Sequence, residues 1–248
     1  MSASAPARRY LVEAASAPYR RGSRFALHFA RGKLRWDPVF HHLIGRGLIA
    51  PRSRVLDIGC GQGLLASLLN AAVAQARSGG WPADWAEAPA DARVTGIELV
   101  QHDVSRARDA LGRDADFVCG DMRHTAFPKV DTVVILDALH YLSIAEQDTV
   151  LARVRAALGQ GGRLVLRVGD AASWRGYATS HATSQWVDRI VAFARSRRAR
   201  PRCGRTLAEW QMRLVALGFD VSSLPMHRRT TFANILLVGT VGAKKGAT

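Results

Sequence analysis

The sequence predicts an α/β fold in which helices cover both faces of a seven-stranded, mostly parallel sheet. Short apolar segments of strand length alternate with longer segments of helical period through most of the 248 residues. The segment 130–139 is apolar nearly throughout, which is typical of a strand buried on both faces. The last two strand-like segments have no helix between them, so we expect an antiparallel hairpin at one edge of the sheet.

The first 50 residues are expected to form an N-terminal lid of helices. Residues 1–33 are basic and weakly patterned, and we expect a mobile start followed by a lid helix. Asp37 and Pro38 predict the start of a helix over 37–49, because aspartate caps a helix well and proline fits its first turn.

From residue 51 onward the pattern predicts one sheet domain over 51–248. We expect strands at 54–59, 93–99, 115–121, 130–139, 162–169, 220–227 and 234–241. The helices between them are expected at 63–76, 103–112, 144–158 and 206–218. Two stretches interrupt the alternation, 78–91 and 170–204, and we interpret both as insertions.

Composition excludes several classes of protein. No run of about 18 apolar residues is free of charge, so no membrane span is expected, and the N-terminus lacks the apolar core of a signal peptide. Cys60, Cys119 and Cys203 lie far apart, which indicates neither a metal site nor a disulfide framework. We therefore expect a cytoplasmic protein without a metal.

The net charge of +15 is high enough to suggest a nucleic-acid or acidic partner. However, only four of the 35 basic residues are lysines, and the chain is rich in alanine. A GC-rich genome produces this composition without selection for binding. Charge alone therefore does not predict a specific nucleic-acid partner.

The stretch RVLDIGCGQG, residues 54–63, places Gly59, Gly61 and Gly63 directly after a buried strand. Glycine lets a ligand approach bare backbone, and the start of the following helix favours polar or anionic groups. In open α/β sheets, ligands bind beyond the carboxyl ends of the strands. A ligand site is therefore expected at this turn.

This stretch resembles the first motif of class I S-adenosylmethionine-dependent methyltransferases. Further segments follow in the order of that family, from VTGIEL and CGDM to DTVVILDALHYL and LGQGGRLVL, so that the resemblance covers about 52–170. It implies a Rossmann-like sheet, methyl transfer as the activity, S-adenosylmethionine as cofactor and S-adenosylhomocysteine as product.

The resemblance also implies roles for residues at the strand ends. Glu98 would accept hydrogen bonds from both ribose hydroxyls, and Asp57 would reach the amino end of the methionine moiety. Asp121 would accept from the adenine amino group, with Met122 packed near the ring. The other residues expected to contact the cofactor are Gly59, Cys60, Gly61, Gly63, Leu99 and Asp137.

The acceptor is expected beyond the fourth strand, at DALHYL. His140 is the best candidate general base by residue type because its ordinary pKa lies near neutrality, and the other explanation is that it caps or packs locally. Tyr19, Phe29, Trp36 and Tyr141 are candidate walls of the acceptor site. We expect deletion of 1–33 to abolish transfer and leave cofactor binding largely intact.

The flank 19–49 resembles the small methyltransferases of bacterial aryl polyene-type pigment clusters. That resemblance implies a small aromatic or acyl-type acceptor from secondary metabolism, free or carried on an acyl carrier protein. The basic run at 195–202 is a candidate docking site for an acidic carrier, or an ordinary solvated face. An RNA methyltransferase that uses the basic surface is the alternative, and the oligomeric state stays open.

Overall fold

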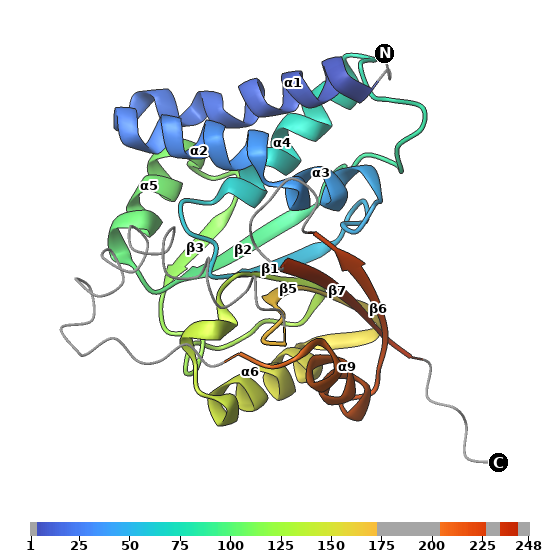
Figure 1. Ribbon diagram of the computed structural model, residues 1–248. Helices are drawn as coiled ribbons and strands as arrows, with labels where there is room; N and C mark the ends of the chain where they lie inside the picture. The colour runs from blue at the N-terminus through green and yellow to red at the C-terminus, as the bar shows by residue number, and fades with distance from the viewer. Residues whose placement is uncertain (1–3, 173–203, 227–233, 243–248) are drawn as a thin grey trace. The chain divides into compact units, whose positions relative to one another are not determined.

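The computed structural model describes residues 4–172, 204–226 and 234–242. The chain divides into two compact units, Met1–Asp121 and Met122–Thr248. Unit 1 contains strands β1 to β3 and unit 2 contains β4 to β7, in the order β3-β2-β1-β4-β5-β7-β6 (Figure 1).

Unit 1 begins with helices α1 (Ser4–Ser16), η1 (Ala17–Arg21), α2 (Arg24–Trp36) and α3 (Pro38–Gly45). The expected mobile start is wrong, because α1 already begins at Ser4 and buries Leu11 and Ala15 completely. The side chain of Ser23 caps α2, and that of Asp37 caps α3 by accepting from the amide of Val39.

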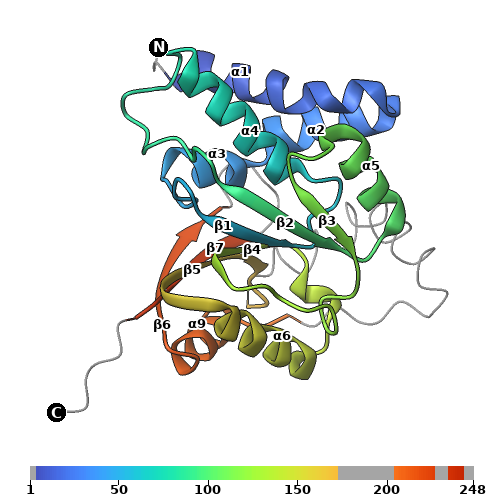
Figure 2. The ribbon, with the colours of Figure 1, turned by 180° about the vertical axis from the view of Figure 1, so that it is seen from behind.

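The strands of unit 1 are β1 (Arg54–Ile58), β2 (Arg93–Glu98) and β3 (Asp116–Cys119), and all pairs are parallel. The helices between them are α4 (Leu64–Arg77) and α5 (Gln101–Leu111). Helix α1 packs alongside α4, and α5 packs against β3 (Figure 2). The parallel register brings Asp57 opposite Gly96 and Glu98 opposite Cys119, so the carboxyl ends of these strands meet at one edge.

The insertion at 78–91 is ordered and has no helix or strand. Trp81 and Trp85 pack edge to face, with ring centroids 5.3 Å apart, and the Trp85 indole lies 3.7 Å from the point that a β-carbon on Gly45 would occupy. The backbone amide of Ala86 donates to the carbonyl of Gly45 at 3.1 Å. The insertion is therefore anchored on the end of α3.

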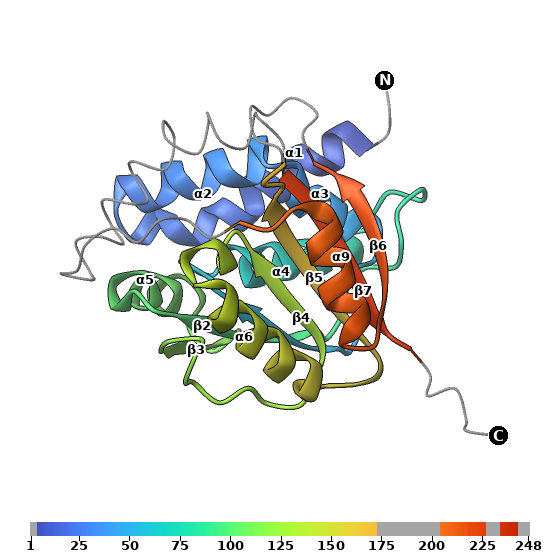
Figure 3. The ribbon, with the colours of Figure 1, turned by 60° about the horizontal axis from the view of Figure 1, so that its bottom comes forward.

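Unit 2 contains β4 (Val130–Leu136), η2 (Leu139–Tyr141), α6 (Ile144–Ala157), β5 (Leu158–Gly169), α9 (Leu207–Ala216), β6 (Phe219–Pro225) and β7 (Asn234–Val241). Strands β4 and β5 are parallel, whereas β7 pairs antiparallel with both β5 and β6. Helices α6 and α9 lie on the same face of these strands (Figure 3). Each begins with a capping box, formed by Ser143 with Glu146 and by Thr206 with Glu209.

The predicted fold class is confirmed: the sheet has seven strands, is mostly parallel and ends in an antiparallel hairpin. Several boundaries differ by a few residues. The third strand ends at Cys119 rather than residue 121, and α3 ends at Gly45 because Arg46 and Gly47 leave the helical conformation. Among the described helices, none is both long enough and apolar enough to cross a membrane.

Candidate functional site

The three glycines of the loop after β1 all adopt the left-handed conformation, with φ of 77° at Gly59, 54° at Gly61 and 80° at Gly63. Position 63 also requires a residue without a side chain, because a β-carbon there would lie 2.8 Å from Cζ of Phe117. At Gly61 a β-carbon would meet nothing within 4 Å. The loop is thus packed against the protein at Gly63 and open at Gly61.

Glu98, at the end of β2, faces this loop. Its Oε2 accepts from the Gly61 amide at 3.0 Å, and its Oε1 accepts from the Val100 amide at 2.9 Å. Burial raises the pKa of Glu98, although these amide bonds act in the opposite direction. The carboxylate therefore holds the open glycine in place while keeping further lone pairs for a ligand.

Asp57, in β1, is 5 % exposed and lies near Glu98. Burial, and then the charge of Glu98, raise the pKa of Asp57 to about 7. Two acidic groups so close together favour a cationic ligand, because a positive charge relieves both their repulsion and their desolvation.

The remaining unit 1 candidates follow the carboxyl ends of β1, β2 and β3. Cys60 is buried, and its Sγ lies 2.7 Å from the position that a β-carbon at Gly96 would take, which explains a glycine inside β2. Leu99 is 37 % exposed, and Asp121 is half-buried just beyond β3. All lie after the carboxyl ends of neighbouring parallel strands.

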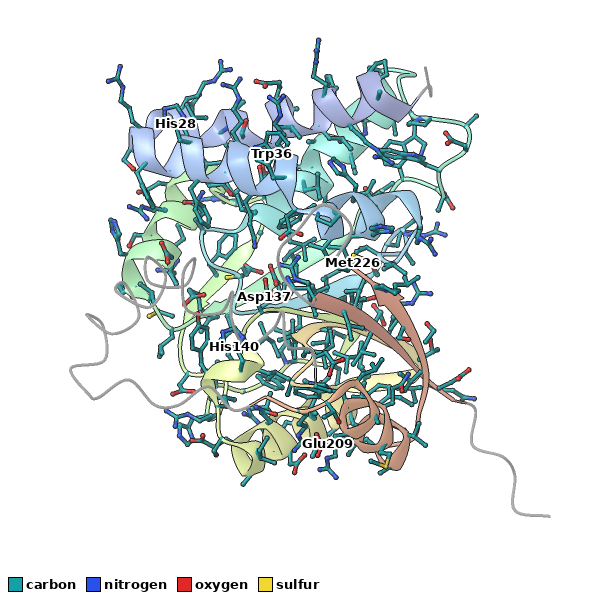
Figure 4. All side chains as sticks on the ribbon, viewed as in Figure 1. His28, Trp36, Asp137, His140, Glu209 and Met226 are labelled. Atoms are coloured by element: carbon teal, nitrogen blue, oxygen red, sulfur yellow. The ribbon has the colours of Figure 1, made fainter. Side chains whose placement is uncertain are left out.

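The aromatic candidates of unit 1 fall into two groups. Tyr19 is only 1 % exposed, and its hydroxyl donates to the carbonyl of Gln62 within the glycine loop at 2.8 Å. Phe29 and Trp36 are exposed on α2, the latter at 74 % (Figure 4). Tyr19 therefore supports the loop, whereas the two α2 rings face outward.

In unit 2, Asp137 directly follows β4 and has a φ of +56°, which is uncommon for a residue with a side chain. Arg167, on the adjacent strand β5, is 2 % exposed and holds the Asp137 carboxylate through two donors, with Nε at 2.8 Å from Oδ1 and Nη2 close to Oδ2. The Asp137 amide also donates to the Arg167 carbonyl at 3.3 Å. Arg167 thus stabilises this strained turn.

His140 follows on the short helix η2 (Figure 4). Its ring centroid lies 4.1 Å from that of Tyr141, the next residue. The side chain of Gln147, on α6, donates to the carbonyls of Leu139 and Leu142 and so fixes the ends of this turn. Both rings are half-buried.

Met122 is half-buried, and its carbonyl accepts from Arg153 Nη1 at 2.6 Å. The expected cofactor contacts Asp57 to Asp121 thus lie in unit 1, whereas Met122, Asp137, His140 and Tyr141 lie in unit 2.

Two residues with clear structural roles were not among the sequence candidates. Gln62 lies between two left-handed glycines and is 3 % exposed, and Arg167 is a charged residue in a buried strand. A polar side chain between glycines and an arginine inside LVLRVG were signals in the sequence. The docking run at 195–202 and most of the insertion at 170–204 lie outside the described residues.

The described residues contain no group of three or more histidine, cysteine, aspartate or glutamate side chains placed to hold a metal ion.

Residues 56–166 match the family described as "Methyltransferase domain", in the region that the resemblance to class I S-adenosylmethionine-dependent methyltransferases covers. A curated relative, the carboxy-S-adenosyl-L-methionine synthase of Chromohalobacter salexigens, is 33 % identical over 140 residues, which cover 52 % of this chain and 47 % of the relative. The chain spans about half the length of the curated relatives it matches.

Solved structures share the fold at low sequence identity. Magnesium protoporphyrin IX methyltransferase (ChlM) from Synechocystis PCC 6803, with S-adenosylhomocysteine bound, is 18 % identical with a TM-score of 0.55, covering 95 % of this chain and 98 % of its own. The pyocyanin biosynthetic protein PhzM is 20 % identical with a TM-score of 0.57, covering 97 % of this chain and 68 % of its own. S-adenosylmethionine is the cofactor of this class, and ChlM has also been solved with it bound.

Proposed function

We propose that this protein transfers the methyl group of S-adenosylmethionine to a small-molecule acceptor, an aromatic or acyl-type biosynthetic intermediate. The observation that carries the proposal is the acidic edge of unit 1, where Glu98 accepts from the amide of the open Gly61 and the buried Asp57 lies near Glu98. ChlM and PhzM, which share the fold, are named for small-molecule chemistry, and this supports the choice of acceptor class.

The residues of this edge fit the cofactor in charge and shape. The cofactor carries positive charge on its sulfonium and amino groups, and the raised pKa of Asp57 is what a carboxyl shows before a cation reaches it. We assign Asp57 to the amino end of the methionine moiety, Glu98 to the ribose hydroxyls, and Asp121 with Met122 to the adenine. Gly61 would offer the cofactor backbone that no side chain covers.

When bound, S-adenosylmethionine supplies an activated methyl group, and its transfer leaves S-adenosylhomocysteine. The protein then has to position the acceptor, exclude water and receive a proton where the acceptor must lose one. We assign the proton to His140, which Gln147 helps to hold by fixing both ends of η2. Arg167 keeps the preceding turn in place through Asp137. Phe29, Trp36 and Tyr141 are the proposed acceptor walls.

The exposed face of the N-terminal helices favours an acceptor delivered by an acidic partner. Residues 1–36 contain eight basic residues and one acidic residue, Glu13, which is paired with Arg31. The exposed side chains of this segment include Arg8, Arg9, Arg20, Arg21, Arg24 and Arg35, together with Tyr10, Phe25, Phe29 and Trp36. A surface of arginines and aromatic rings suits an acyl carrier protein, which is acidic and presents its cargo on a flexible arm.

The test is a turnover assay with 4-hydroxybenzoate-type acids, free and loaded on a carrier protein. Formation of methylated product and S-adenosylhomocysteine in equal amounts is expected. If the acceptor is a phenol, His140→Ala should lower kcat about 10²–10⁴-fold and leave cofactor affinity unchanged. Good cofactor binding without methylation of any such acceptor would contradict the aromatic proposal.

Two further measurements distinguish the proposed reaction from other reactions. An RNA methyltransferase would place label from the cofactor in RNA, and its RNA affinity would fall steeply with salt. The curated relatives are named carboxy-S-adenosyl-L-methionine synthase, which suggests a reaction that modifies S-adenosylmethionine itself. Mass spectrometry would then detect a heavier sulfonium product and no S-adenosylhomocysteine.

A further inference from the structure

We propose that Tyr19 and Gln62 are positioning residues for the cofactor: through them the N-terminal helices hold the glycine loop in its binding shape and set cofactor affinity. This inference rests on the proposed function and assigns a further role to the segment expected to form an N-terminal lid. It predicts that changes in η1 and in the first turn of α2, away from the proposed acceptor walls, alter the affinity for the cofactor.

Three buried hydrogen bonds join the N-terminal helices to the loop and to the helix that follows it. The Tyr19 hydroxyl, in η1, donates to the Gln62 carbonyl at 2.8 Å. The Gln62 side-chain amide donates to the Ala26 carbonyl, in α2, at 3.0 Å. The Ser67 hydroxyl, in α4, donates to the Ala15 carbonyl, in α1, at 2.6 Å. Gln62 is therefore held at both its backbone and its side chain by segments about 40 residues earlier in the chain.

The loop needs such external support because its own sequence supplies little rigidity. Gln62 lies between Gly61 and Gly63, and glycine has more accessible backbone conformations than any other residue. The carbonyl of Gln62 and the amide of Gly63 belong to the same peptide group, so a donor on that carbonyl fixes the direction of that amide. The Gly63 amide in turn donates to the Cys60 carbonyl at 3.0 Å, which closes the turn around the open Gly61.

The two anchoring groups are themselves well fixed. Tyr19 is 1 % exposed, and burial raises the pKa of its hydroxyl above the usual range, so it stays a protonated donor at every working pH. Ala26 lies in the first turn of α2, where its amide donates to the capping side chain of Ser23 at 3.1 Å. The loop is thus attached to a rigid helix end on one side and to a buried ring on the other.

The experiment compares Tyr19→Phe and Gln62→Met with Tyr10→Phe, which removes the hydroxyl of a tyrosine that is 43 % exposed on α1. Calorimetric titration with S-adenosylhomocysteine, well below the Tm, is expected to give a Kd about three- to tenfold higher for the first two variants. Tyr10→Phe should leave the Kd for S-adenosylhomocysteine unchanged. In turnover assays, KM for S-adenosylmethionine should rise while kcat at saturating cofactor and KM for the acceptor stay unchanged.

The outcomes separate this inference from the function on which it rests. Variants with a lower Tm but a wild-type Kd for S-adenosylhomocysteine would reduce both residues to a structural role and overturn the inference alone. Wild-type protein that does not bind S-adenosylhomocysteine would overturn the proposed function as well. Gln62→Met interrupts the support from α2 rather than η1, so the test does not depend on the folding of one variant.

Discussion

Asp57 and Glu98 of unit 1 differ in their partners from several acidic residues of unit 2. In unit 2, Asp137 is paired with Arg167, and Asp148 with Arg205 and Arg213. In unit 1, Asp57 and Glu98 lie close together, and the described hydrogen bonds of Glu98 come from backbone amides rather than from basic side chains.

The pKa values follow this difference. Glu146 of unit 2 receives backbone and side-chain hydrogen bonds from Ser143 and an ion pair from Arg123, which lower its pKa to about 2. Burial instead raises the pKa of both Asp57 and Glu98. Asp137, Asp148 and Glu146 of unit 2 are held by basic side chains, whereas Asp57 and Glu98 of unit 1 are two buried acids whose charge a cationic ligand can balance.

Glu98→Ala gives the largest expected effect, because it removes the proposed ribose acceptor and also the bond to the Gly61 amide. Hydrogen bonds to a charged group contribute roughly 1.5–3 kcal/mol, so the Kd for S-adenosylhomocysteine should rise about 10- to 100-fold. Calorimetric titration measures this, with the exposed Glu87→Ala as the control. An unchanged affinity would remove Glu98 from the cofactor site.

Asp57 predicts a pH dependence of cofactor affinity. With a pKa of about 7, its carboxyl is mostly neutral at pH 6 and ionised above pH 7, and only the ionised form attracts a cation. Affinity for S-adenosylmethionine should therefore increase about tenfold between pH 6 and 7.5. Asp57→Asn should flatten this profile, and a wild-type profile equal to that of the variant would contradict the assignment.

The same carboxyl affects the stability of the cofactor-free protein in the opposite direction. Its pKa in the folded state lies above the ordinary value of 3.8, so the folded state binds more protons than the unfolded state between these values. The free energy of unfolding should be highest below the ordinary value and decrease as pH rises through about 7. Urea unfolding of the wild type and Asp57→Asn at several pH values measures this contribution.

Arg167→Met is expected to have a smaller effect, on stability rather than on the cofactor. It leaves the Asp137 carboxylate without its bidentate partner, but that side chain is 34 % exposed, so water compensates in part. We expect a loss of about 1 kcal/mol in urea unfolding. Combining it with Asp137→Asn should recover part of the loss, and strictly additive effects would show that the pair contributes no coupling.

Trp36→Ala should have the smallest effect on stability, because its side chain is 74 % exposed on α2. The expected change in the free energy of unfolding is below about 0.5 kcal/mol. KM for the acceptor should nevertheless rise if the ring is a wall of the acceptor site. A large loss of stability would show that the ring packs against the protein instead.

The sequence predicted best those features in which local pattern and fold agree. Strand β7 begins and ends at the predicted residues, Asn234 and Val241. An apolar run of this length, too short for a typical helix, has few alternative secondary structures. The glycine loop was placed correctly because three glycines after a buried strand indicate a turn with positive φ angles, and the structure has such angles at all three. In both places a short segment is sufficient to specify its own structure.

Features that depend on distant partners were missed. Helix α1 buries small residues such as Ala7 and Ala15 against α4, and alanine gives a weak hydrophobic period. Tyr19 was predicted from its residue type to line the acceptor site, whereas its hydroxyl bonds to a loop 43 residues away. The partner of Arg167 is likewise visible only once β4 and β5 are paired. Contacts between residues that lie 30 or more positions apart depend on tertiary packing, and the local sequence pattern does not predict them.

The edge-to-face pair of Trp81 and Trp85 gives unit 1 an optical signature of its own. Two indoles at this distance couple their electronic transitions, which produces a paired band in far-ultraviolet circular dichroism that disappears when the rings separate. Unit 2 carries a different reporter in Trp210, which is 2 % exposed and whose fluorescence shifts when water reaches it. Following both signals through one denaturation shows whether the two units unfold in a single step or in sequence.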